Sequence, residues 1–433
     1  MALVNVIGGG LSGCEAALQL ADKGHTVRLF EMRDKVQTPA HKTNNLAELV
    51  CSNSFKGTGL TSAHGLFKKE LLTLGSHLLR YAQEASVKAG ESLTVDREVF
   101  SKRVEKAIED HSNIELIRDE VTQIDPEEWT LISAGPLCSD ALSKEVFKLV
   151  GGDKLHFFDA IAPVVHVDSI DMNHAFYKNR WEKGDTEDFI NCPLDKETYD
   201  QFVKDLVEAD AVEPKPFEKK ELFEGCLPIE EMAKRGPQTL SFGPMRPVGL
   251  MHPETGEKFY AVIQLRAENA QKSLYNMVGF QTRLKWGTQK EIMSKVPALK
   301  NAEFARMGVM HRNTFIEAPK VLTEKLRFKD SKVFFSGQII GAEGYTEAVG
   351  TGLYAASQID ADINQKELNY PIESCLGSLT NFLTSPNPQY QPMNFNFGLL
   401  PTPTEGKKKQ RKELQVKSAI ESIEKFLEIT ASN

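Results

Sequence analysis

The fold is decided by residues 3–31, Leu-Val-Asn-Val-Ile-Gly-Gly-Gly-Leu-Ser-Gly-Cys-Glu-Ala-Ala-Leu-Gln-Leu-Ala-Asp-Lys-Gly-His-Thr-Val-Arg-Leu-Phe-Glu. They read as a strand, a glycine turn, a helix, a tight turn and a second strand that ends on an acid. The G-x-G-x-x-G spacing permits a sharp turn, the approach of a pyrophosphate and close packing of the helix on the sheet. The acid at the end of the second strand is placed to bind both hydroxyls of an adenosine ribose. We therefore expect a site for FAD or NAD(P) rather than a purely structural turn, with contacts from Gly8, Gly9, Gly10, Leu11, Ser12, Gly13 and Glu31.

Composition narrows the class of protein. A length of 433 residues suggests two or three domains. The net charge of −8 argues against a chain that coats nucleic acid by bulk electrostatics, although it leaves room for a local basic face. The six cysteines are scattered without a C-x-x-C pair, which disfavours disulfides and zinc and suits a reducing cytoplasm. The short apolar start, followed at once by glycines, is typical neither of a signal peptide nor of a membrane span. We expect a cytoplasmic protein without a metal site or a membrane partner.

The pattern of predicted secondary structure changes twice along the chain. Up to residue 160, strands and helices alternate, with helical spacing over Leu66–Ala89 and an amphipathic helix over Asp96–Asp110. From 161 to 310, a possible helix at Asp200–Val207 accompanies short β-like runs at Glu221–Phe223, Thr239–Phe242, Phe259–Leu265 and Tyr275–Gln281. From 311 to 433 the alternation of strands and helices returns. We therefore expect an α/β fold whose Rossmann-like domain, with a mostly parallel sheet, is interrupted by an inserted α+β domain.

The third part of the chain offers a second contact to the dinucleotide. Lys332–Ser336 reads as a strand, Gly337 and Gln338 as a turn, and Glu347–Ile359 as a helix of small residues. A late strand–glycine–helix unit is the usual second contact of FAD folds, and Tyr345, between its turn and its helix, is a candidate to cover the flavin ring. Since the chain has a single G-x-G-x-x-G, we expect tightly held FAD, with NAD(P)H arriving at a transient site.

Two cysteines stand in unusual surroundings. Cys51 follows an apolar run that breaks into small polar residues, and Cys226 lies in a glycine- and proline-flanked loop. A reactive thiol needs cations or a helix N-terminus nearby, and Lys234 and Arg235 are candidates for the second cysteine. A lone cytosolic cysteine is more often buried and inert, so both interpretations stay open on this pattern. His311 is likewise more often a structural histidine than a functional one.

Basic residues are the candidates for RNA contact. The run Lys407–Lys412 precedes a helical segment at Ala419–Leu427, and further lysines and arginines are scattered through the inserted part. A solvated linker is the more common interpretation of such a run. The alternative is a patch that contacts the phosphates of a nucleic acid.

The chain resembles the folate- and FAD-dependent tRNA (uracil-5-)-methyltransferases, which are distant relatives of the flavoprotein that modifies wobble uridines. The resemblance runs nearly end to end. Its most specific motifs are Glu48-Leu-Val-Cys-Ser-Asn-Ser, Phe223-Glu-Gly-Cys-Leu-Pro-Ile-Glu, Gly243-Pro-Met-Arg-Pro-Val-Gly-Leu, Met310-His-Arg-Asn-Thr-Phe and Asn394-Phe-Asn-Phe-Gly-Leu-Leu. Small departures, such as Cys14 where many members have serine, lie away from the expected chemistry.

The resemblance implies a reaction and assigns roles to the two cysteines. Cys226 is expected to add to C6 of uracil, which makes C5 nucleophilic, and Cys51 to remove the C5 proton or assist in its removal. Methylenetetrahydrofolate would supply the carbon, and FAD reduced by NAD(P)H the electrons. The expected product is 5-methyluridine in the T-loop of tRNA, from a base that has left its stack. The alternatives are the same chemistry on ribosomal RNA, a non-catalytic flavin-containing RNA-binding protein, and a general NAD(P)H–flavin oxidase.

Overall fold

The glycine-rich stretch folds as its sequence predicts. The computed structural model describes residues 1–38, 40–151, 155–160, 162–182, 187–212, 227–308, 310–388, 390–404 and 408–431. In it β1 (Leu3–Ile7) leads through the glycines into α1 (Leu11–Asp22), and β2 (Thr26–Phe30) returns beside β1 in parallel. The predicted strand–helix–strand unit is thereby confirmed.

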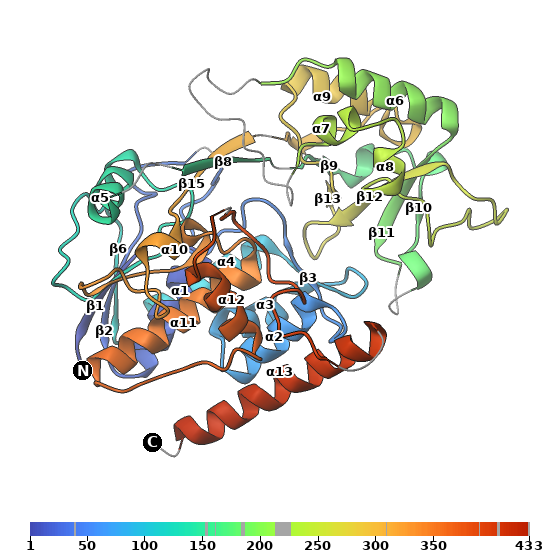
Figure 1. Cartoon of the computed structure of the whole chain (residues 1–433). Coiled ribbons are helices and arrows are strands. Elements are labelled where there is room, and N and C mark those ends of the chain that lie inside the picture. Colours follow the sequence, from blue (N-terminus) through green and yellow to red (C-terminus); the bar gives the residue numbers. More distant parts are fainter. Residues whose placement is uncertain are drawn as a thin grey trace.

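A five-stranded parallel sheet is built around this unit. Its order is β16 (Val333–Phe335), β7 (Thr130–Ile132), β1, β2 and β6 (Ile114–Ile117). The long helix α11 (Tyr345–Ile363) lies beside α1, and the two pack so closely that a Cβ on Gly352 would lie 2.3 Å from the Ser12 carbonyl oxygen (Figure 1). The late strand–helix unit therefore returns to the first one, although more than 300 residues separate Ser12 from Ser336.

Further helices and a small antiparallel sheet complete this part of the molecule. The sheet has the order β3 (Ser54–Gly57), β5 (Ser92–Val95) and β4 (Ser86–Val87). The helices are α2 (Ala63–Thr73), α3 (His77–Glu84), α4 (Arg97–Glu109), α5 (Asp140–Val150), α10 (Ala318–Val321), α12 (Cys375–Thr384) and α13 (Lys408–Ala431). Helix α4 matches its prediction, and the Asp96 side chain caps it by accepting the N–H groups of Glu98 and Val99.

One predicted helical stretch is confirmed only in part. Leu66–Ala89 is mostly helical but contains the end of α2, all of α3 and the short strand β4, because Gly75 turns the chain at a φ of +85° and the Ser76 hydroxyl caps α3. The apolar periodicity continues across this break, so periodicity alone did not indicate it.

The middle of the chain forms a second sheet, six-stranded and antiparallel. Its order is β10 (Phe176–Tyr177), β11 (Phe189–Leu194), β12 (Ala261–Ala267), β13 (Leu274–Met277), β9 (Val164–His166) and β14 (Phe304–Arg306). The helices beside it are α6 (Lys196–Glu208), α7 (Ile229–Lys234), α8 (Thr239–Phe242) and α9 (Trp286–Met293). The prediction of β-like structure at Thr239–Phe242 is wrong, since these residues are the short helix α8. The predicted run Glu221–Phe223 lies outside the described residues.

Short 3-10 helices occur in both parts of the molecule. They are η1 (Val167–Ser169), η2 (Met172–His174), η3 (Arg180–Glu182), η5 (Pro297–Leu299) and η6 (Gly337–Ile340). Within the described residues, no helix is both long and apolar enough to cross a membrane.

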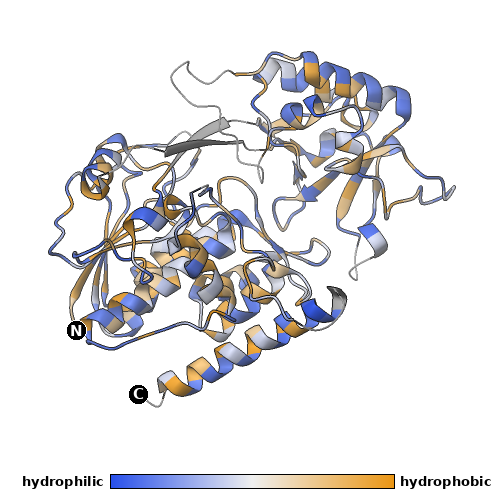
Figure 2. Cartoon of the chain, viewed as in Figure 1, coloured by the Kyte–Doolittle hydropathy of each residue, from blue (hydrophilic) through white to orange (hydrophobic). Residues whose placement is uncertain are grey.

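Two hydrophobic cores divide the molecule. One includes buried side chains between Val4 and Phe147 and between Phe315 and Ala419, and we name the part around it lobe 1. The other runs from Ala162 to Ala302 and defines lobe 2. The antiparallel strands β8 (Leu155–Ala160) and β15 (Met310–Phe315) carry the chain between them, and hydrophobic residues concentrate on the inner elements of each lobe (Figures 1 and 2). The α/β fold class, with a parallel sheet and a further antiparallel region, is confirmed.

Candidate functional site

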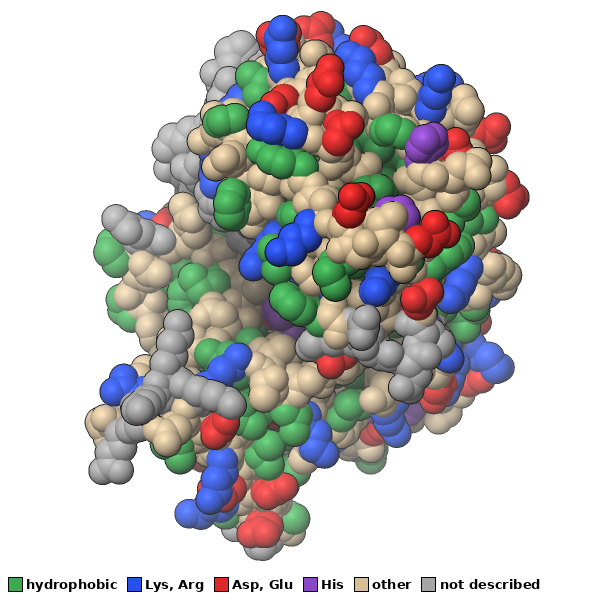
Figure 3. Space-filling view, turned by 90° about the vertical axis from the view of Figure 1, so that its right-hand side faces the viewer, with side chains coloured by type: hydrophobic (Ala, Val, Ile, Leu, Met, Phe, Trp, Pro, Cys, Tyr) green, Lys and Arg blue, Asp and Glu red, His purple; other side chains and the backbone are tan. Residues whose placement is uncertain are grey.

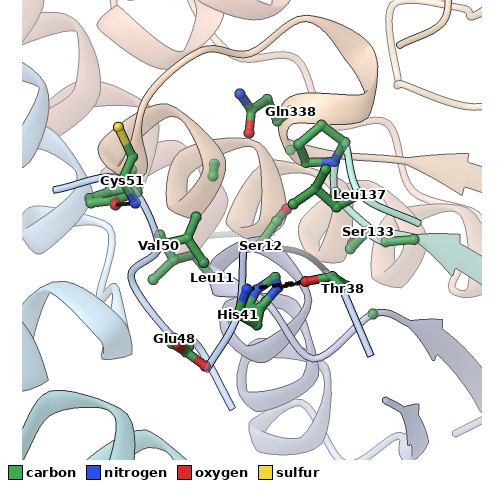
Figure 4. A pocket seen from close by; sticks show the side chains of 18 of the residues that line it. Leu11, Ser12, Thr38, His41, Glu48, Val50, Cys51, Ser133, Leu137 and Gln338 are labelled. Carbon is green, nitrogen blue, oxygen red and sulfur yellow. Dashed lines mark hydrogen bonds between the residues drawn. The ribbon is translucent and has the colours of Figure 1, made fainter. Parts of the chain in front are cut away.

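A cavity of about 400 Å³ lies at the carboxyl ends of the parallel strands, where α/β folds bind their ligands. Its walls come from the turn after β1, from the residues that follow β2, β7 and β16, and from β12 and β13 of lobe 2. Figure 4 shows Cys51 and Gln338 at one end of the cavity and Thr38, His41 and Glu48 at the other. One end of the cavity therefore presents a thiol and an amide, and the other presents a hydroxyl, an imidazole and a carboxylate.

The glycine turn leaves backbone donors open to the cavity. Gly8 has a φ of +111°, and a Cβ there would lie 2.6 Å from the Ser133 carbonyl oxygen, so only glycine fits. Gly13 lies behind the turn, where a Cβ would come within 1.9 Å of the Gly8 carbonyl oxygen. In the described part of the chain, no hydrogen bond occupies the N–H groups of Leu11 and Ser12 at the start of α1. These donors and the positive end of the helix favour an anion.

A buried network of charges holds the carboxylate of Glu31 at the far end of the cavity. One oxygen accepts the N–H of Gly9 at 3.0 Å, and the other accepts N–H and Nε of Arg33 at 3.0 and 2.9 Å. The Arg33 guanidinium also reaches Glu48 at 3.4 Å. Burial alone would raise the pKa of Glu31, but Arg33 and the N–H donors outweigh it and hold the pKa below its usual range. Glu31 is therefore an ionised acceptor with a fixed orientation.

Three serines join the strand ends in the middle of the cavity. The Ser336 hydroxyl lies 2.7 Å from the hydroxyls of both Ser12 and Ser133, which links β16 to α1 and to the end of β7. The next residue, Gly337, donates its N–H to the Thr351 hydroxyl at 2.9 Å, and Gln338 contacts Glu343. This bonding places the Gly337–Gln338 turn against the glycine turn of β1.

One hydroxyl group, that of Tyr345 in α11, binds three backbone groups of the Cys51 loop (residues 49–52). Tyr345 accepts the backbone N–H of Cys51 at 3.0 Å and that of Ser52 at 2.9 Å, and it donates to the Ser52 carbonyl at 2.7 Å. Burial raises the pKa of this tyrosine, so the hydroxyl keeps its proton. Tyr345 thus fixes the backbone that carries the Cys51 thiol into the cavity.

Arginines of both lobes also hold this loop. Arg266 of lobe 2 donates to the Ser52 hydroxyl at 2.8 Å, Arg306 to the Val50 carbonyl at 3.3 Å, and Arg97 contacts the Leu49 carbonyl. Arg97 also pairs with Glu268 at 2.6 and 3.2 Å. Burial alone would raise the pKa of Glu268, but Arg97 outweighs it and the pKa lies below its usual range. Three cations therefore surround the loop against one ionised carboxylate.

Most residues predicted for the site line this one cavity. They are Gly8, Gly10, Leu11, Ser12, Glu31, Cys51, Gly337, Gln338 and Tyr345. Gly9 and Gly13 lie just behind it in the turn. Cys226 lies outside the described residues, as does the side chain of His311, whose backbone belongs to β15. The roles of all these residues in binding or catalysis stay predictions.

Sequence reasoning missed several side chains that shape the cavity. Arg33 and Glu48 complete the network around Glu31, and the signal was present in the spacing Glu31-x-Arg33. Arg266 was one basic residue among many. Asn276, which is 4 % exposed and whose amide nitrogen has no hydrogen-bond partner among the described residues, carried no signal at all.

Comparison with known proteins places the chain among flavoprotein-like folds and RNA-modifying enzymes. The model of the family "Glucose inhibited division protein A" matches residues 3–367. The methylenetetrahydrofolate–tRNA-(uracil-5-)-methyltransferase TrmFO of Aquifex aeolicus (strain VF5) is 50% identical over 429 residues, which cover 98% of this chain and 96% of the relative. The protein of the same name from Bacillus subtilis (strain 168) is 48% identical, covering 97% and 98%.

A solved structure shares the fold at low sequence identity. The chain superposes on Aquifex aeolicus GidA with a TM-score of 0.68 and 16% identity, covering 98% of this chain and 73% of GidA.

Proposed function

Because the chain belongs to the TrmFO family of methylenetetrahydrofolate–tRNA-(uracil-5-)-methyltransferases, within the glucose inhibited division protein A family, we propose that it makes 5-methyluridine in the T-loop of tRNA. The carbon comes from methylenetetrahydrofolate, and NAD(P)H provides the electrons through bound FAD. The observation that carries the proposal is the single cavity in which a dinucleotide turn opens toward Cys51.

The residues of the cavity fit FAD. Glu31 presents an ionised carboxylate for the ribose hydroxyls, and the open N–H groups of Leu11 and Ser12 suit the pyrophosphate. Gly337 and Gln338 line the cavity beside this turn, where the remainder of the dinucleotide would pass. When bound and reduced, FAD supplies the two electrons that convert a methylene carbon into a methyl group.

Two cysteines act on the uracil ring, one by forming a covalent bond to it and the other in the removal of a proton. The Cys226 thiolate adds to C6, so that a sulfur–carbon bond forms and the electron pair moves toward C5. After C5 has received the carbon, a base removes the C5 proton and the sulfur–carbon bond breaks. Cys51 lines the same cavity as the dinucleotide turn, at the end where Gln338 lies, which supports its assignment to the proton step.

The test follows the transferred carbon. Purified protein receives NAD(P)H, methylenetetrahydrofolate labelled in its methylene carbon, and unmodified tRNA and ribosomal RNA transcripts side by side. Nuclease digestion and mass spectrometry then locate the label. We expect it in the T-loop uridine of tRNA, with loss of turnover in Cys226→Ala and retention in the matched variant Cys192→Ala, whose thiol is buried in β11 away from the cavity.

Other outcomes separate the alternatives. Label only in ribosomal RNA would keep the chemistry and replace the substrate. An absence of label in both RNAs, with rapid NAD(P)H oxidation that ignores RNA and folate, would indicate a flavin oxidase. RNA binding without turnover in the unaltered protein would indicate a non-catalytic RNA-binding flavoprotein.

A further inference from the structure

Lobe 2 presents exposed aromatic and apolar side chains together with the exposed Arg246 and the half-buried Arg180. We name this surface the η3–α8 patch, and its members are Arg180, Trp181, Phe242, Arg246, Val248 and Met251. Phe242 is 73% exposed and Trp181 63% exposed. Side chains of this size seldom face solvent together without a partner.

Hydrogen bonds and close packing join η3 to residues 248 and 249 of the patch. The N–H of Trp181 donates to the Gly249 carbonyl at 3.1 Å, and Nη1 of Arg180 donates to the Val248 carbonyl at 2.8 Å. The indole of Trp181 lies so close to Gly249 that a Cβ there would come within 2.8 Å of it. Trp181 also adopts a φ of +59°, a conformation that bulky residues rarely take without tertiary restraint. These contacts therefore fix Arg180 and Trp181 against residues 248 and 249.

The charge on the patch is positive. In the described part of the chain neither Arg180 nor Arg246 pairs with a carboxylate, Glu254 and Glu257 on the following turn included, and Arg180 donates only to Gln264 and to the Val248 carbonyl. Burial and the nearby Arg246 both lower the pKa of Arg180, because a like charge close by disfavours the charged form. An anionic partner would relieve this repulsion.

A line of polar side chains connects the patch to the cavity. Arg180 donates through Nε to Gln264 at 2.6 Å, and Gln264 and Arg266 extend from the same face of β12. Arg266 reaches the Cys51 loop and lines the cavity, and Asn276, which is opposite it in the sheet, lines the cavity as well. Figure 3 shows the molecule hollowed between the lobes, with hydrophobic and basic side chains around the hollow.

We propose that the η3–α8 patch binds the RNA strand next to the target uridine, with bases stacked on Phe242 and Trp181 and phosphates held by Arg180 and Arg246. This inference rests on the proposed function and adds the surface through which the substrate is held. Aromatic faces and arginines are the combination that single-stranded RNA recognises. A second copy of this chain would leave the unpaired arginines facing each other across a symmetric interface, so RNA is the better occupant.

The test measures the affinity of a fluorescently labelled, unmodified tRNA transcript by anisotropy at several salt concentrations. We expect Phe242→Ser to weaken binding about 5- to 50-fold through lost stacking. Arg246→Glu should weaken it about 10-fold and lower the slope of log affinity against log salt by about 1. The matched controls Trp286→Ser and Lys204→Glu change an equally exposed aromatic on α9 and a lysine on α6, and both should bind like the unaltered protein.

The outcomes are separable from those of the proposed function. If the unaltered protein neither binds nor methylates tRNA, the proposed function fails and this inference with it. If it does both, and Phe242→Ser and Arg246→Glu bind like the controls, the patch is not the RNA surface. Loss of a dimer in these variants on sedimentation, at unchanged RNA affinity, would assign the patch to a second copy and overturn the inference.

Discussion

Replacing Tyr345 by phenylalanine removes one oxygen atom and leaves three backbone groups of the Cys51 loop without a partner. The N–H groups of Cys51 and Ser52 lose an acceptor at 3.0 and 2.9 Å, and the Ser52 carbonyl loses a donor at 2.7 Å. The ring of Tyr345 stays packed against Phe55, with their centroids 5.5 Å apart. The change therefore isolates the hydroxyl group.

The magnitude follows from these three bonds. Each hydrogen bond contributes about 0.5–1.5 kcal/mol net, and water reaches the half-buried loop and replaces part of the loss. We expect the loop to open more easily by about 1.5–3 kcal/mol, which corresponds to about 10- to 150-fold faster exchange of the Cys51 and Ser52 amide hydrogens. If Cys51 acts on the base, kcat for methyl transfer should fall at least about 10-fold while KM for tRNA stays the same.

Two measurements and one control test this reasoning. Hydrogen exchange resolved to residues 50–53 reports the opening of the loop, and urea unfolding reports global stability. The control Tyr354→Phe removes a hydroxyl from the same helix, where it donates to the Glu324 carbonyl at 2.8 Å. This control should lower the free energy of unfolding by about 1 kcal/mol and leave exchange at Cys51 unchanged.

Unchanged exchange at Cys51 and Ser52 in Tyr345→Phe would refute the role of the hydroxyl in holding the loop. A fall in kcat without faster exchange would point instead to direct action of the hydroxyl on the reaction.

Three further predictions concern the turn, its packing and a buried acid. Glu31→Gln should weaken FAD binding about 10- to 100-fold in fluorescence titrations, because it removes the charge that orders the ribose end. Gly13→Ala brings a Cβ within 1.9 Å of the Gly8 carbonyl oxygen and should lower the free energy of unfolding by about 1–3 kcal/mol. Burial raises the pKa of Glu70, which accepts two N–H groups at the start of α12, from 4.5 to about 7. Its contribution to stability is therefore full below pH 4.5 and is lost as the pH rises through 7. In urea titrations at several pH values, Glu70→Gln should reduce this dependence of the free energy of unfolding on pH, which amounts to up to about 3 kcal/mol.

Matched variants separate these effects from nonspecific ones. Glu115→Gln changes an exposed carboxylate on β6 and should leave FAD affinity unaltered. Gly287→Ala lies in α9 with open space around the new Cβ, and it should be neutral or slightly stabilising. Equal FAD affinity in Glu31→Gln, equal stability in Gly13→Ala, or the same pH slope in Glu70→Gln would each contradict the corresponding argument.

The elements that the sequence predicted correctly are those with short-range signals. The β1–α1–β2 unit follows from apolar runs and glycine spacing, and α4 begins where Asp96 can cap it. The prediction of β structure for Thr239–Phe242 failed because the β-branched and aromatic residues there favour a strand. Burial of Leu240 in the core of lobe 2 and the glycines at 236 and 243 favour a short helix instead. The α/β class was therefore predictable, while the breaks within long periodic stretches were not.

By itself, the sequence determined the dinucleotide turn, the position of Glu31 after β2 and the candidate status of Cys51, because these depend on spacings within about thirty residues. Only the tertiary structure decided what surrounds Cys51. Arg266 and Ser52 are 214 residues apart, and the Tyr345 hydroxyl and the Ser52 amide are 293 apart. Such contacts arise from the packing of lobe 2 and α11 against the Cys51 loop, and no local periodicity records which side chains that packing brings together.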